Sequence, residues 1–220
     1  MISETSLDMN MAKVVVAGSY LVALVMEVKR IPSVGETVHG KNYFQTHGGK
    51  GSNMAIQVAR LGAQCSFVGS VGDDSHGNHF MQLLKKEGIE ASGLKQRRNS
   101  ATGVGFIMVD PAGQNVISID SGANALFSLS DINEAASSWQ GSGAILTQFE
   151  VPIETAFHAM KVGKKRGYKT ILNPAPAEVL IDRDLSSVSV ITPNETEAHI
   201  CLGLAPDKLV DEEELALRLL

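Results

Sequence analysis

The segment Gly48-Gly49-Lys50-Gly51-Ser52-Asn53 is the part of this chain whose residue types and spacing are best suited to chemistry. Its glycines allow a sharp bend and a close approach of the backbone to a ligand. The apolar residues that follow, Met54, Val58 and Leu61, predict a helix whose first amides point back into the bend. The segment therefore predicts a pocket for an oxygen-rich ligand, and the alternative is a tight turn with a purely structural role.

Further polar residues stand where strands are expected to end and helices to begin. The amide of Asn53 both donates and accepts hydrogen bonds, which suits sugar hydroxyls, although it could also cap its helix. Glu150 closes a strand at the edge where open α/β sheets place ligands, or it stabilises the dipole of the helix that starts near Pro152. Asn194 and Glu197 are three residues apart, a spacing that is typical of a reciprocal helix cap.

The elements that must position these residues alternate between strand and helix, which predicts an α/β fold with a largely parallel sheet flanked by helices in three layers. Strands are expected at Lys13–Gly18, Gln64–Ser70, Ala144–Phe149, Tyr168–Asn173 and Val188–Thr192. Helices are expected at Asn53–Leu61, Gly77–Glu87, Ile153–Arg166, Glu195–Leu202 and, at the end of the chain, Asp211–Leu220. The glycines that follow four of these helices predict left-handed C-terminal caps: Gly62, Gly88, Gly167 and Gly203.

Two stretches, roughly 20–47 and 99–123, interrupt this alternation with strand-like runs. In the second stretch, Thr102–Val109 and Asn115–Asp120 are joined by a turn at Asp110–Gly113. We interpret the two stretches as a small β-sheet that forms a lid. The alternative is a pair of antiparallel edge hairpins without a gating role.

Composition and charge narrow the function classes. The chain of 220 residues is 44% hydrophobic and has a net charge of −5 without a large Lys/Arg cluster, which argues against nucleic-acid binding. We expect no membrane span, because the longest apolar run, Val14–Val28, is short and interrupted, and no secretory leader, because Met1–Asn10 carries no positive charge. Cys65 and Cys201 are expected to be reduced core thiols of a cytoplasmic protein, and the pair His76 and His79 an exposed helix face instead of a zinc site.

Several motifs, in one order along nearly the whole chain, resemble the ribokinase (PfkB-type) family of carbohydrate kinases. The resemblance starts with Gly48–Ala55 and continues through Arg60–Ala63, Val68–Gly77, Ser121–Ala125, Gln148–Glu150, Asn173–Pro176 and Thr192–Glu197. It implies a Rossmann-like fold with a β-lid that commonly pairs with the lid of a second subunit in a homodimer. It also implies transfer of phosphate from ATP, with Mg²⁺, to a primary hydroxyl of ribose or a related sugar.

The resemblance assigns roles to individual residues. It implies that the sugar-binding positions are Gly49, Lys50, Asn53 and Glu150. It places Asn194 near the phosphates of ATP and Glu197 near the magnesium ion, which a carboxylate holds through water.

The chain also departs from the family pattern. The family's first strand normally ends in Gly-Ser-x-Asn-x-Asp, whereas Leu21 and Ala23 stand here at the Asn and Asp positions. Losing both hydrogen-bonding side chains would weaken sugar binding roughly thirty- to two-thousand-fold. Either the ligand is different and more apolar at that edge, or the site has decayed.

The family's catalytic aspartate lies in a Gly-Ala-Gly-Asp type motif, and residues 1–220 contain no such motif. We therefore expect an incomplete, C-terminally truncated domain without the catalytic base, the anion hole or the monovalent-cation loop, and hence without activity alone. The rival hypotheses are a non-catalytic sugar-binding or oligomerising protein and an unstable fragment.

Overall fold

A computed structural model describes residues 12–206 and 210–219. Its main sheet has six strands in the order β10-β9-β8-β1-β4-β5, and every pair of neighbours is parallel. The strands are β1 (Lys13–Ala17), β4 (Gln64–Gly72), β5 (Glu90–Arg97), β8 (Ala144–Thr147), β9 (Lys169–Leu172) and β10 (Val190–Ile191). The predicted α/β class and parallel sheet are therefore confirmed, whereas the inferences about Met1–Asn10 and the position of Leu220 lie outside the described residues.

Helices follow the strands at nearly the predicted places. They are α1 (Lys50–Arg60), α2 (Ser75–Lys86), α3 (Leu129–Ala136), α4 (Ile153–Lys165), α5 (Glu195–Cys201) and α6 (Glu212–Leu219), together with a 3₁₀ turn η1 (Gly122–Leu126). The glycines expected to end four helices all have positive φ angles, between 67° and 86°. This is the left-handed conformation that residues with a Cβ rarely adopt.

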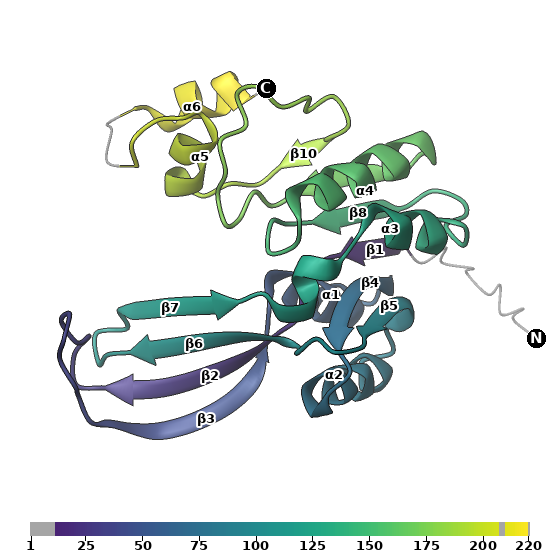
Figure 1. Cartoon of the computed structure of the whole chain (residues 1–220). Helices are drawn as coiled ribbons and strands as arrows, with labels where there is room; N and C mark the ends of the chain where they lie inside the picture. Colours follow the sequence, from purple (N-terminus) through teal and green to yellow (C-terminus); the bar gives the residue numbers. More distant parts are fainter. Residues whose placement is uncertain (1–11, 207–209, 220) are drawn as a thin grey trace, which may run out of the picture.

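Helices cover both faces of the main sheet, so it has a hydrophobic core on each face. The side chains of β1 point alternately to one face and the other and contribute to both cores. Val15 and Ala17 point to one face and pack in a cluster with residues of α3 and α4. Val16 points to the other face and packs in a cluster with residues of α1 and α2. The result is a sandwich of three layers, with α3 and α4 on one side of the sheet and α1 and α2 on the other (Figure 1). Helices α5 and α6 form a smaller cluster of their own.

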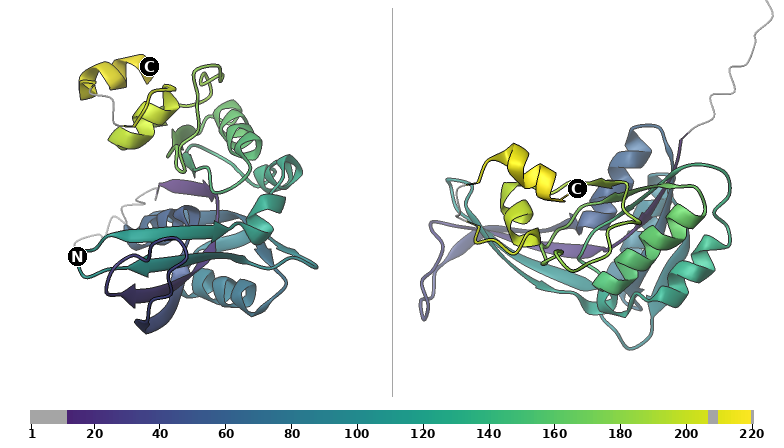
Figure 2. Two further views of the ribbon diagram at one scale, coloured as in Figure 1. Left: turned by 60° about the vertical axis from the view of Figure 1, so that its left-hand side comes forward. Right: turned by 90° about the horizontal axis from the view of Figure 1, so that it is seen from above.

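A second sheet of four strands, in the order β3-β2-β6-β7, projects from one side of the main sheet, and α5 and α6 stand on that same side (Figures 1 and 2). Its strands are β2 (Leu21–Val28), β3 (Gly40–Gly48), β6 (Gly103–Val109) and β7 (Asn115–Asp120). Strands β2 and β6 are parallel, and the two outer pairs are antiparallel. We call these four strands the small sheet. No helix covers its outer part in the three views, and β3 and β7 are exposed along almost their whole length, whereas Leu21, Val22 and Ala23 at its base are buried.

The structure also contains elements that the sequence patterns did not predict. Strand β5 forms at the edge of the main sheet by pairing with β4, and α3 is a short helix that begins with a capping box between Ser128 and Asp131. One side chain was placed wrongly: Leu61 was expected on the apolar stripe of its helix but is 75% exposed, because α1 ends at Arg60. The buried residues of α1 are Gly51, Ser52 and Ala55.

Among the described residues, no helix is both long enough and apolar enough to cross a bilayer. Cys65 and Cys201 are buried free thiols, as predicted, and burial raises their pKa values to about 12 and about 11, respectively. These thiols are therefore protonated and unreactive at neutral pH.

Candidate functional site

Three groups from distant parts of the sequence meet where β1 and β8 end. The Glu150 Oε2 atom accepts a hydrogen bond of 2.6 Å from the Ser19 hydroxyl and one of 2.7 Å from the backbone amide of Lys50. Ser19 follows β1, Glu150 follows β8, and Lys50 is the first residue of α1. Between β1 and β8 the strand order reverses direction along the chain, and open α/β sheets bind ligands at such a point. The glycine bend and Glu150 thus belong to one site.

Close backbone packing explains why the bend is rich in glycine. A Cβ atom at Gly51 would lie 2.4 Å from the amide nitrogen of Ser19, and one at Gly49 would lie 2.9 Å from that of Leu21. Gly49 also has a φ angle of 97° and is the N-cap of α1. The glycines therefore seat the start of α1 directly against the chain that leaves β1.

The first amides of α1 point into the bend, as predicted, but they have partners within the protein and are not left free for a ligand. Lys50 donates to Glu150, Gly51 donates to the Ser19 hydroxyl at 3.3 Å, and Ser52 donates to the Ser19 carbonyl at 2.9 Å. Glu150 supplies the negative charge that a helix N-terminus favours. That helix is α1, whereas the sequence had suggested the one near Pro152.

Asn53 lies in the first turn of α1 with an exposed side chain. The structural alternative for this residue was wrong, because Gly49 and not Asn53 occupies the N-cap position. The Asn53 backbone amide donates to the Gly49 carbonyl at 3.0 Å. Its side-chain amide forms no hydrogen bond with a described residue, so it is free to meet a ligand.

Asn124 and Gln148 are buried polar residues that sequence reasoning assigned no role. Asn124 holds the backbone of Tyr20 at both polar atoms: its Oδ1 accepts from the Tyr20 amide at 3.1 Å, and its Nδ2 donates to the Tyr20 carbonyl at 2.8 Å. The Gln148 Oε1 atom accepts from the Glu150 amide, while its buried Nε2 has no hydrogen-bond partner among the described residues. Both residues lie in motifs that carry the family resemblance, Ser121–Ala125 and Gln148–Glu150. This was the signal in the sequence that could have identified them.

Leu21 and Ala23, the two residues that depart from the family pattern, face the glycine bend. They are 5% and 8% exposed, and a Cβ atom at Gly48 would lie 3.3 Å from the Ala23 Cβ. Because β2 alternates, both side chains point to the same face of the small sheet. This edge of the site is therefore apolar.

Asp74 joins α2 to the start of β6. Its Oδ1 accepts from the Gly77 amide at 2.8 Å and from the Thr102 hydroxyl at 2.7 Å, while its Oδ2 accepts from the Thr102 amide at 2.7 Å. Burial is the largest single influence and raises the pKa of Asp74, but the hydrogen bonds from Thr102 and Gly77 together outweigh it and lower the pKa. The carboxylate is thus held ionised.

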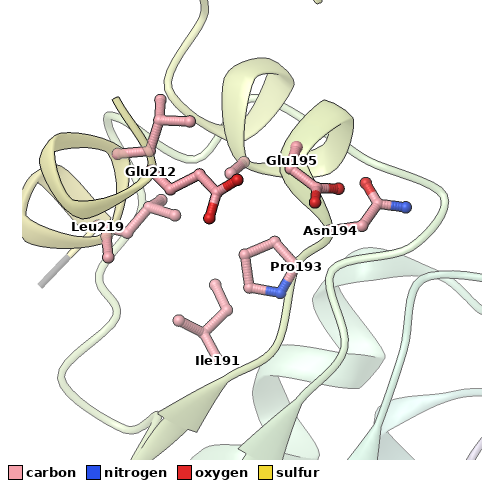
Figure 3. A pocket seen from close by; sticks show the side chains of 9 residues that line it. Ile191, Pro193, Asn194, Glu195, Glu212 and Leu219 are labelled. Carbon is pink, nitrogen blue, oxygen red and sulfur yellow. The ribbon is translucent and has the colours of Figure 1, made fainter. Parts of the chain in front are cut away.

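Asn194 and Glu197 cap α5, as the structural alternative proposed. The Asn194 side chain accepts from the Glu197 amide at 2.8 Å, and the Glu197 Oε2 atom accepts from the Asn194 amide at 2.9 Å. Beside them lies a cavity of about 350 Å³ between α5, α6 and the end of β10. Figure 3 shows Asn194 and Glu195 at its edge, with Ile191, Pro193 and Leu219 around it.

The residues at this end of the chain fit a water-mediated magnesium ion better than a direct one. Among residues 12–206 and 210–219, no group of three His, Cys, Asp or Glu side chains could hold a metal. Glu197 uses one carboxylate oxygen for the cap, and no described residue donates to the other. A single free carboxylate oxygen suits Mg²⁺, which keeps most of its water ligands.

Comparison with known proteins shows the family. The pfkB family carbohydrate kinase model matches residues 11–220. The ribokinase of Mus musculus is 39% identical over 195 residues, which make up 88% of this chain and 60% of that protein. The deoxyribokinase of Salmonella typhi is 34% identical over 195 residues, with coverage of 88% and 64%.

A solved structure shows the same fold. The structure described as Arabidopsis thaliana ribokinase complexed with ribose and ATP has a TM-score of 0.73 and 28% identity, and the match covers 95% of this chain and 67% of that one. The chain thus spans less than two thirds of the length of the Mus musculus and Salmonella typhi relatives. On its motifs, its fold and these matches, the chain belongs to the pfkB family of carbohydrate kinases.

Proposed function

We propose that the protein built on this chain is an ATP-dependent sugar kinase that phosphorylates a primary hydroxyl of a pentose or related sugar. The observation that carries this proposal is the meeting of Glu150, Ser19 and the start of α1 at the point where the strand order reverses. Family membership supports the reaction class. Phosphoryl transfer depends mostly on positioning and on neutralising charge, and a carboxylate fixed at this point positions a hydroxyl.

The sugar is held by groups around the glycine bend. The Glu150 Oε2 atom is committed to Ser19 and Lys50, whereas its Oε1 atom accepts no hydrogen bond from a described residue. Oε1 therefore accepts a sugar hydroxyl. Asn53 presents an exposed amide one turn into the same helix, and it donates to or accepts from a second hydroxyl. Lys50 and Gly49 complete this side of the site.

The substrate is a sugar with fewer hydroxyls, or an apolar substituent, at the edge that Leu21 and Ala23 line. A hydroxyl buried against these two side chains would lose its water partners without replacement, at a cost of about 1–3 kcal/mol. A deoxy sugar avoids that cost. The similarity to a protein named deoxyribokinase agrees with this choice.

Calorimetry with ribose and 2-deoxyribose tests the substrate. We expect 2-deoxyribose to bind roughly tenfold more tightly than ribose, since about 1.4 kcal/mol corresponds to a factor of ten. The double variant Leu21→Asn/Ala23→Asp should reverse the preference. Val25→Asn, on the same face further along β2, is the matched control and should leave it unchanged. Equal affinity for both sugars in the original chain would contradict the proposed substrate.

ATP and magnesium belong at the carboxyl end of β10. Asn194 would hold the phosphates, and the carboxylate oxygen of Glu197 that the cap leaves free would hold a water ligand of Mg²⁺. When bound, the ion neutralises phosphate charge. The proposed role of Glu197 is to hold a water molecule, and it can do so because the helix cap uses only one of its two carboxylate oxygens.

Residues 1–220 alone are proposed to have negligible kinase activity, because they contain no Gly-Ala-Gly-Asp type segment to supply a base and an anion hole. An assay of ADP release with a panel of sugars checks this. Normal turnover by the 220-residue chain would refute it. Extending the reading frame past Leu220 to include such a segment should restore turnover, with Glu150→Gln as the inactive control.

The small sheet is proposed to act as a lid and to pair with the small sheet of a second copy. One of its faces is almost wholly apolar and carries Phe44, Ile107, Ile117 and Ile119, of which Phe44, Ile117 and Ile119 are 43–51% exposed. The opposite face mixes Phe106 with polar residues of β3 and β7. Covering the apolar face with its own copy removes that exposure. The buried thiols favour a cytoplasmic location.

A non-catalytic sugar-binding protein is the second candidate. The same apolar edge at Leu21 and Ala23 favours it, together with the missing base. Calorimetry with fructose, nucleosides and sugar acids distinguishes the sugar-binding protein from the kinase. Binding without turnover in the extended chain would support the non-catalytic protein, and no binding of any of these compounds would rule it out.

A further inference from the structure

A groove of about 410 Å³ lies between the small sheet and α2, and three histidines line it. His47 comes from β3, whereas His76 and His79 come from α2, as does Lys86 near the end of that helix. We call these four residues and the space between them the histidine groove. Two glutamine side chains, Gln45 and Gln82, also line it.

The groove is separate from the candidate sugar site. Val22 and His47 are opposite each other in the antiparallel pairing of β2 and β3, so their side chains share one face of the small sheet. Leu21 and Ala23, one position away on either side, point to the other face. A ligand in the histidine groove therefore occupies the reverse side of the small sheet from the sugar.

The groove offers hydrogen-bond donors and positive charge. The Tyr20 hydroxyl lies 2.9 Å from the His47 Nδ1 atom, and burial followed by the charge of Asp74 raises the Tyr20 pKa to about 12, so this hydroxyl keeps its proton. When it donates to Nδ1, the imidazole hydrogen is on Nε2, which becomes a donor. Lys86 contributes a cation, and His76 and His79 contribute ring nitrogens that can donate to an anion.

No Asp or Glu among the described residues lines the groove, and the nearby carboxylates of Asp74 and Glu87 have other partners. Asp74, whose charge acts on His76 and Tyr20, accepts three hydrogen bonds from Gly77 and Thr102. Glu87, next to Lys86, pairs with Arg60 at 2.6 Å. In the part of the chain that the structure describes, no side chain forms an ion pair with His76, His79 or Lys86. Lys86 is thus the only Lys or Arg among the described residues that line the groove, and its charge also acts on Glu87.

We propose that the histidine groove binds a tetrahedral oxyanion, either a free phosphate or the phosphate group of a small monoester, between His47, the α2 histidines and Lys86. Such an anion satisfies donors from both sides of the groove. The apolar wall formed by Val22 and Leu83 receives the body of an ester. Since His47 belongs to the small sheet and the other groups to α2, the bound anion ties the small sheet to the body of the protein. His47 directly precedes Gly48, so this tie acts at the base of the glycine bend.

Titration of the 220-residue chain with phosphate, sulfate and phenyl phosphate, followed by NMR of the histidine ring protons, tests the proposal. Burial, then the charge of His79, lowers the His47 pKa, and a bound anion should raise it again. Sulfate keeps its two charges between about pH 8 and about pH 6, and its binding should strengthen several-fold over that range, because the bound anion favours the protonated imidazole of His47. Phenyl phosphate should bind more tightly than phosphate if the site takes an ester, and equally if it takes the free ion.

Single charge changes on one helix provide the control. Lys86→Gln and His79→Gln should each weaken sulfate binding roughly three- to tenfold, because the first removes a charged donor and the second an imidazole donor. Lys85→Gln removes the same charge from the neighbouring exposed position, which does not line the groove, and should change binding less than twofold. His39→Gln is the matching histidine control. Equal losses in Lys85→Gln and Lys86→Gln, or ring protons of His47 and His79 that do not respond to any anion, would overturn the proposal.

Hydrogen exchange gives a second readout that is independent of affinity. Saturating sulfate should slow the exchange of amides in β3 of the original chain, because the anion ties that strand to α2. The Lys86→Gln variant should show less slowing at the same sulfate concentration. Unchanged exchange in β3 of the original chain would remove the proposed tie between the small sheet and the body.

Discussion

The main sheet and the small sheet are built from similar β-branched and aromatic residues, but their side chains have opposite surroundings. Val16, Phe67 and Ile145 in the main sheet are 0% exposed, because helices cover both its faces. Phe44, Phe106 and others in the small sheet are about half exposed. The main sheet is therefore stabilised by its own helices, whereas the small sheet depends on its junction with the body and on whatever covers its faces.

Glycine substitutions give the sharpest test of this difference. Gly51→Ala should destabilise the fold by more than about 3 kcal/mol, because the new Cβ would meet the backbone of Gly18 and Ser19 at 2.4–2.7 Å. Gly105→Ala in β6 should change stability by less than about 1 kcal/mol, since its nearest neighbour is Ile119 at 4.0 Å. Urea unfolding of both variants measures the effect. Similar losses in the two variants would show that the sheets are equally constrained.

Substitutions at the junction between the two sheets should have the next largest effect on stability. Asn124→Ala should cost about 2–3 kcal/mol, because the amide and carbonyl of Tyr20 would lose their buried partner. Asn133→Ala, at an exposed position whose side chain forms a hydrogen bond with His158, is the control and should cost less than about 0.5 kcal/mol. Thermal unfolding distinguishes them. If the two variants melt together, Asn124 does not hold the small sheet in place.

The carboxylate of Asp74 makes this junction sensitive to acid. Its folded-state pKa is depressed, so its contribution is fully present above the unfolded value of 3.8 and is lost as pH falls through the lower folded value. Thr102→Val removes the hydroxyl that joins Asp74 to the Gly72 amide and should cost about 1–2 kcal/mol near neutral pH. The variant should also reduce the loss of unfolding free energy at acidic pH. Stability profiles between about pH 2 and about pH 7 check both, and an unchanged profile would contradict the assignment.

The smallest effect on folding is expected on the open face of the small sheet. Ile119→Glu should alter the unfolding free energy by no more than about 0.5 kcal/mol, yet weaken self-association at least roughly tenfold. Val116→Glu, on the opposite face of β7 and 44% exposed, is the matched control. Sedimentation at several concentrations compares them. Dimers that persist in Ile119→Glu and dissociate in Val116→Glu would assign the interface to the other face.

The sequence predicted what depends on local signals. Helix ends with a glycine in the left-handed conformation, such as Gly88 and Gly167, carry their signal within one turn. Strand β5 has a mixed sequence, Glu90–Arg97, and owes its extended form to pairing with β4, so no pattern within it indicated a strand. The short α3 could have been found from Ser128 and Asp131, which form its capping box.

The candidate site was predicted in outline only. The carboxyl end of its strand indicated a ligand edge for Glu150, but only the family resemblance placed the glycine bend beside it, because that bend follows β3 of the small sheet. That Glu150 would bond to the Lys50 amide could not be predicted, because the two residues are 100 positions apart and only tertiary packing sets their distance. The same limit applies to Asn124 and Tyr20, which are 104 positions apart.

The bond between Glu150 and the start of α1 links ligand recognition to folding. One oxygen of this carboxylate stabilises the N-terminus of α1, and the other is left for a ligand. A single side chain therefore has two roles. Replacing it cannot alter substrate choice without also loosening the first helix. On the proposed function, substrate preference should therefore diversify through neighbours such as Leu21 and Ala23, whose replacement leaves that helix terminus intact.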